Sequence, residues 1–118
     1  MAFNVNSFRV AFRVVDASGN PVPEVTVGPP SNAAPDVKAG ETVTVTVPVT
    51  NAAGQPVATV SDAVPKFVSG ANVLSSAEVV TPVAVAAGET KDVPVQFVTR
   101  ADALVGQQAV YDVDLVVA

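Results

Sequence analysis

Residues 42–50 read Thr-Val-Thr-Val-Thr-Val-Pro-Val-Thr, so that every second residue is a valine. Successive side chains of a β-strand point to opposite faces of the sheet, and this alternation therefore places the valines on one face. Valine is branched at Cβ, which suits the pleated surface of a sheet better than the crowded surface of a helix. We therefore predict that residues 42–50 form a strand with one apolar face.

The same period of two recurs near both ends of the chain, in residues 8–15 and 111–117, and no segment shows a sustained helical period. Short strands separated by turns rich in Gly, Pro, Asn and Asp predict an all-β fold, an antiparallel β-sandwich of about seven strands. Residues 28–36 are expected to cross from one sheet to the other. The less regular strands are predicted in residues 22–27, 57–64, 79–85 and 93–99.

The length of 118 residues fits one domain, and 49% of the residues are hydrophobic. We expect an N-terminal arm in residues 1–7 and a single sandwich domain in residues 8–118. Pro48 and Pro94 lie inside predicted strands and cannot donate to a ladder, so each is expected at a sheet edge or a bulge. The predicted core consists of Val10, Phe12, Val14, Val45, Val47, Val95, Phe97, Tyr111, Val113 and Leu115.

The residue types argue for binding rather than catalysis. Histidine and cysteine are both absent, which removes Ser–His and Cys–His nucleophiles, zinc and haem ligation, iron–sulfur clusters and disulfides. The net charge of −5 should repel nucleic-acid phosphates and anionic lipid, and no apolar run approaches the roughly 20 residues of a spanning helix. We expect a non-enzymatic protein without a cofactor, a metal or a small-molecule substrate, whose partners are proteins.

Two acidic residues near the C-terminus are candidates for a metal site or an acid–base pair. Asp112 and Asp114 share one face of a predicted strand, roughly 7 Å apart at the strand rise. Calcium needs six or more oxygen ligands, and no acidic loop accompanies the pair, so we favour a solvated outer face. Asp16, Asn20 and Asn51 are interpreted as turn-forming residues rather than ligands.

Candidate partner-binding residues lie near the N-terminus and in the middle of the chain. Arg9 and Arg13 share one face of the first strand, either as charged gatekeepers of a solvated edge or as a docking stripe for an acidic surface. Phe3 would then be an apolar anchor on the arm. Lys66 and Phe67 lie in a segment expected to be an exposed loop, where Phe67 either contacts the partner or plugs the core beneath the loop.

Several short motifs together resemble a known family. Residues 15–23 (VDASGNPVP), Ala39-Gly40-Glu41 running into residues 42–50, and Ala87-Gly88-Glu89-Thr90 before Tyr111-x-Val113-x-Leu115 are similar to bacterial and phage immunoglobulin-like (Ig-like) modules. The resemblance implies an Ig-like sandwich, although the Trp and the Cys pair of antibody domains are absent. If residues 111–117 are its penultimate strand, either residues 8–15 or a neighbouring subunit must supply the last one.

The resemblance implies two functions. One is a virion structural protein that decorates a phage capsid, binds and stabilises the shell, and acts as a homo-oligomer on the capsid surface. The other is an adhesion module of a secreted or cell-surface bacterial protein. A start at Met1, the lack of a signal peptide and the single domain favour the virion hypothesis. Carbohydrate binding is a third hypothesis, weakened by the absence of Trp.

Overall fold

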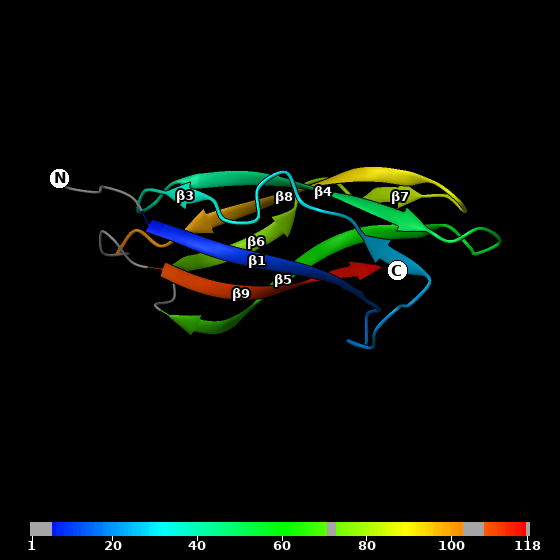
Figure 1. Ribbon diagram of the computed structural model, residues 1–118, viewed down its shortest axis with the longest axis horizontal. Coiled ribbons are helices and arrows are strands. Elements are labelled where there is room, and N and C mark those ends of the chain that lie inside the picture. Colours follow the sequence, from blue (N-terminus) through cyan, green and yellow to red (C-terminus); the bar gives the residue numbers. More distant parts are fainter. Residues whose placement is uncertain (1–5, 71–72, 103–107, 118) are drawn as a thin grey trace.

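The computed structural model describes residues 6–70, 73–102 and 108–117, which form nine strands in two sheets and no helix. The five-stranded sheet has the order β3-β1-β9-β5-β7, and the four-stranded sheet has the order β2-β4-β8-β6 (Figure 1). The strands are β1 (Asn6–Val15), β2 (Val25–Val27), β3 (Asp36–Val37), β4 (Thr42–Asn51), β5 (Ala58–Gly70), β6 (Leu74–Val79), β7 (Val83–Val85), β8 (Thr90–Thr99) and β9 (Gln108–Val117).

The two sheets enclose a shared core of aliphatic and aromatic side chains, which makes the fold β-sandwich-like. Nine of the ten predicted core residues are buried, and Phe12 is partly buried against them. Aromatic rings bridge the layers, since Phe8 on β1 lies 5.3 Å from Phe97 on β8, centroid to centroid. The alternation of valines thus predicts correctly which face of each regular strand is covered.

The first and last strands lie side by side. β1 runs parallel to β9, with Phe8 opposite Ala109 and Val14 opposite Leu115, and β5 pairs antiparallel with the other side of β9. Of the two alternatives for the strand beside residues 111–117, a neighbouring subunit or residues 8–15, the structure has residues 8–15 there. Among the described strands this is the one parallel pair, so the prediction of a wholly antiparallel sandwich is wrong at this position.

Three other sequence-based predictions need correction. The prediction of one strand over residues 79–85 is wrong, because β6 ends at Val79 and β7 begins at Val83 in the other sheet. The two-residue strand β3 was not predicted. The segment from Lys66 to Gly70 is not a loop, because β5 continues through it alongside β9. Residues 28–35 do connect the two sheets as expected, from β2 to β3.

Pro48 and Pro94 lie in the internal strands β4 and β8, not at the sheet edge that the sequence predicts, and neither lies at a recorded bulge. The short outer strands explain why they are tolerated. β2 pairs with β4 only at residues 49–51, and the pairing of β6 with β8 reaches Val95 but not Pro94. Each proline therefore lies just beyond the end of the edge strand, β2 or β6, that pairs with its own strand. No strand is present there to accept a hydrogen bond, so the missing N–H of proline costs nothing.

No helix long and apolar enough to cross a membrane occurs in the described part of the chain.

Candidate functional site

Charged side chains gather on the side of the five-stranded sheet that faces away from the core. Arg13 is opposite Asp114 in the β1–β9 register, and Lys66 is opposite Asp112 in the β5–β9 register, so all four share that side. We call this surface the outer face. It includes Asp36 on β3, Arg9, Ala11 and Arg13 on β1, Asp62, Val64, Lys66 and Ser69 on β5, and Val110, Asp112, Asp114 and Val116 on β9.

The outer face differs in charge from the rest of the protein. It holds three of the six basic residues of the chain and four of the eleven acidic ones, Asp36, Asp62, Asp112 and Asp114. The remainder of the chain therefore carries three basic and seven acidic residues. The outer face is close to neutral, with a net charge of −1, whereas the rest of the chain carries −4 of the overall −5.

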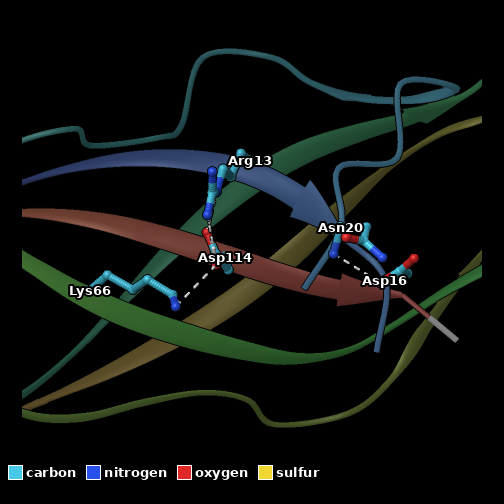
Figure 2. A network of polar contacts seen from close by, with 5 residues as sticks. All are labelled: Arg13, Asp16, Asn20, Lys66 and Asp114. Carbon is cyan, nitrogen blue, oxygen red and sulfur yellow. Dashed lines mark hydrogen bonds and ion pairs between the residues drawn. The ribbon is translucent and has the colours of Figure 1, made fainter. Parts of the chain in front are cut away.

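A buried carboxylate organises the middle of the outer face (Figure 2). Asp114 is only 4% exposed, and Arg13 donates to both of its oxygens, from Nε to Oδ1 at 2.5 Å and from Nη2 to Oδ2 at 3.2 Å. Lys66 Nζ lies 3.8 Å from Oδ2 on the other side. The hydrogen bond to Asp114, followed by its negative charge, raises the pKa of the Arg13 guanidinium.

The interpretation of Asp112 and Asp114 as a solvated pair is right for Asp112 and wrong for Asp114. Asp112 is exposed, whereas Asp114 lies on the central strand between the long side chains of Arg13 and Lys66. Such side chains keep their charged ends in water while their stems cover what lies beneath. No group of three or more possible metal ligands occurs among the described residues.

Arg9 lies toward one end of the outer face and borders a hollow of about 340 Å³. Its guanidinium has no carboxylate within 4.0 Å among the residues that the structure describes. Gly70, at φ +88°, forms part of the wall, and a Cβ there would overlap the carbonyl oxygen of Gln108. The other lining residues are Ala34, Asp36, Ser69, Ala109 and Val110.

A second hollow of about 270 Å³ lies where the β1–β2 turn borders β5 and β9, and Asp114 and Lys66 line it. The turn is held by Asp16, whose Oδ1 accepts the backbone N–H group of Asn20 at 3.0 Å (Figure 2). The same oxygen accepts the backbone N–H group of Ser18 at 2.9 Å. Asp16 N also donates to the carbonyl oxygen of Asn20 at 2.8 Å. The interpretation of Asp16 and Asn20 as turn-forming residues is confirmed.

Phe67 is neither a core plug nor a fully exposed side chain. Its ring lies 5.7 Å from that of buried Tyr111, centroid to centroid, while 48% of the residue remains exposed. Val68 and Val64 nearby are 53% and 38% exposed. In the β5–β9 register Val64 is opposite Asp114 and shares the outer face, whereas Phe67 is opposite Tyr111 and lies on the core side of the sheet.

The open edge of β5 is protected against pairing with another strand. Beyond Val60 no described strand pairs with β5 on the side away from β9. Ala63 N donates to Asp62 Oδ1 at 2.8 Å, Pro65 has no N–H, and register shifts occur at both ends of this stretch. These are the devices by which β-proteins block edge-to-edge association.

Of the five candidate partner-binding residues, Arg9, Arg13 and Lys66 share the outer face, Phe67 lies on the other side of β5 against Tyr111, and Phe3 lies outside the described residues. The ion pairs of Asp114 are not predicted from the sequence, because they depend on the register of β9 against both β1 and β5, which no local pattern gives. The interpretation of Asn51 as a turn residue is wrong, because Asn51 is the last residue of β4 and is buried, although its Nδ2 donates across the following turn to the Pro56 carbonyl oxygen at 2.8 Å. No protein-family model, no curated protein and no solved structure matches this chain.

Proposed function

We propose that the protein is a non-enzymatic Ig-like virion structural protein that decorates a phage capsid, with the outer face docked on an acidic part of the shell. The observation that carries the proposal is the concentration of half of the basic residues on one open sheet face of an otherwise acidic chain. Such an asymmetry orients a protein toward a negatively charged partner and away from copies of its own acidic surface.

The geometry of the outer face supports docking on a protein rather than on a flexible polyanion. Asp114 fixes the side chains of Arg13 and Lys66, so less side-chain entropy is lost when a partner binds. The exposed apolar residue Val64 shares the face with these charges and offers area for burial. A mixture of apolar area and oriented charge is typical of protein–protein interfaces.

The topology supports an Ig-like arrangement. An Ig-like module that lacks its final strand needs another strand beside its last one. In this chain β1 occupies that position, paired with β9. The open edge of β5 is blocked by Pro65, by the Asp62–Ala63 hydrogen bond and by bulges, which suits a protein displayed at high local density. Copies that bind the assembled shell but not its free subunits would stabilise it by mass action.

The test uses particles of the phage whose genome encodes the chain. Mass spectrometry of purified particles should detect the protein, and the recombinant protein should co-sediment with particles that lack it. The Arg9→Gln/Lys66→Gln variant should bind more weakly, and added salt should weaken wild-type binding because the contacts are exposed ion pairs. Lys38→Gln/Lys91→Gln removes two exposed charges outside the outer face and should bind like the wild type.

Absence of the protein from every particle fraction, or equal binding by both double variants, would contradict the proposal. A reading frame that continues past Ala118 or begins upstream of Met1 would favour the alternative, an adhesion module of a surface or secreted bacterial protein. The same outer face would then bind a partner at the cell surface.

A further inference from the structure

Arg9 differs from the other cations of the outer face in having no partner within the described structure. Arg13 and Lys66 both lie against Asp114, at 2.5 and 3.8 Å. Away from this face, Lys91 and Arg100 pair with Glu89 and Asp102. Arg9 has no carboxylate within 4.0 Å among the described residues, yet it is exposed and lines the hollow of about 340 Å³.

The lining of this hollow suits a planar anion attached to a polypeptide. A guanidinium presents parallel N–H groups that match the two oxygens of a carboxylate. Ser69 and Gln108 add side chains that donate and accept hydrogen bonds. Gly70 keeps one wall free of a side chain, since a Cβ there would overlap the Gln108 carbonyl oxygen.

The negative charge of Asp36, which also lines the hollow, restricts the kind of ligand that can bind there. Asp36 lines the same space and has no basic nitrogen within 4.0 Å in the described part of the chain. The Asp36 carboxylate repels a small inorganic anion such as phosphate. It favours a ligand that has N–H donors as well as a carboxylate of its own. An acidic residue within a peptide has both groups.

We propose that Arg9 anchors a binding site for the side chain of an Asp or Glu residue on the partner, an inference that rests on the proposed docking function. Arg9 binds the carboxylate of that residue, and Asp36 accepts hydrogen bonds from the adjoining peptide. The Arg13–Asp114–Lys66 cluster orients the outer face, while Arg9 makes the contact that selects the partner.

The experiment titrates ¹⁵N-labelled protein with N-acetyl-glutamate amide and follows the Arg9 Nε–H signal and the backbone amides of Gly70 and Gln108. Saturable shifts at these three groups are expected. N-acetyl-glutamine amide and acetate should bind more weakly, because the first lacks the carboxylate and the second lacks the amide donors. Arg9→Gln should abolish the saturable shifts. Arg9→Lys should weaken binding about fivefold, the effect of one lost hydrogen bond, because lysine keeps the charge but lacks the parallel N–H groups that match both carboxylate oxygens. Lys91→Gln, which removes the same charge from the other sheet, should bind like the wild type.

Shifts that do not saturate, or shifts of equal size in Arg9→Gln, would overturn the site. Binding of phage particles by Arg9→Gln as tightly as by the wild type would overturn the role of Arg9 in docking while leaving the proposed function intact. Failure of the wild-type protein to bind particles would refute the proposed function, and the titration would still decide whether Arg9 binds a carboxylate.

Discussion

Arg13 and Asp114 lie 101 positions apart in the sequence and face each other across the parallel β1–β9 pair, joined through both carboxylate oxygens. The exposure of the two partners is unequal. The side chain of Arg13 is 56% exposed, whereas that of Asp114 is 6% exposed. The two partners should therefore respond differently to mutation, because only one of them can be hydrated when the other is removed.

Arg13→Gln should destabilise the protein more than Asp114→Asn. The first variant leaves a buried carboxylate that only Lys66 partly compensates, whereas the second leaves an exposed guanidinium that water can solvate. Asp114→Asn should cost about 1 kcal/mol in free energy of unfolding, typical of one lost hydrogen-bonding interaction. Urea unfolding at pH 7 measures both, with Arg9→Gln as the control. A larger loss for Asp114→Asn would contradict this assignment.

Tyr111→Phe should weaken the hydrogen bonding that holds the start of β6. The Tyr111 hydroxyl accepts the buried backbone N–H groups of Val73 at 2.9 Å and Leu74 at 3.0 Å. Phenylalanine keeps the ring contacts but leaves both donors without that acceptor, at a cost of about 2 kcal/mol. Hydrogen exchange of these two amides should accelerate. Ser75→Ala, which removes an exposed hydroxyl from the same strand, should leave their exchange unchanged.

Val47→Asp should abolish cooperative unfolding, because Val47 is fully buried and a carboxylate there would have no partner among its apolar neighbours. Thr44→Asp places the same charge on the exposed face of the same strand and should fold normally. Differential scanning calorimetry distinguishes the two outcomes. A normal melting transition for Val47→Asp would refute the core assignment.

The Arg100–Asp102 pair should give a small acid-dependent contribution to stability. Two hydrogen bonds from Arg100, at 2.9 and 2.8 Å, and then its positive charge lower the pKa of Asp102. A lowered folded-state pKa means that the contribution is present above the ordinary carboxyl pKa of about 4 and is lost as the pH falls through the lower value. The stability difference between wild type and Asp102→Asn should therefore shrink from pH 6 to pH 2. A constant difference would exclude this linkage.

The regular strands could be predicted because the alternation that defines each of them lies within its own short stretch of sequence. In residues 42–50 every valine is two positions from the next, and the buried positions of β4 follow that period. β6 carries no such pattern, since Ser75 and Ser76 are adjacent and both exposed, and a register shift after Leu74 changes which residues face inward. A bulge breaks the period on which strand prediction depends.

The outer face could be predicted only in part. Arg9 and Arg13 were assigned to one stripe because two-residue spacing determines it locally. The placement of Lys66 and Asp114 beside that stripe depends on β9 pairing with β1 and β5, and neither pairing is encoded in a short stretch of sequence. Asp114 looks like any solvated residue of an alternating strand until its neighbours on both sides are known.

The adjacency of β1 and β9 also constrains how the chain is made. The ribosome synthesises the first strand long before its neighbour exists, so Phe8, Val10 and Val14 stay without their β9 contacts until nearly the whole domain has emerged. Contacts so distant in sequence form late and slowly. Nascent chains halted before Gln108 should consequently be protease-sensitive throughout, and resistance should arise in a single step once β9 clears the exit tunnel.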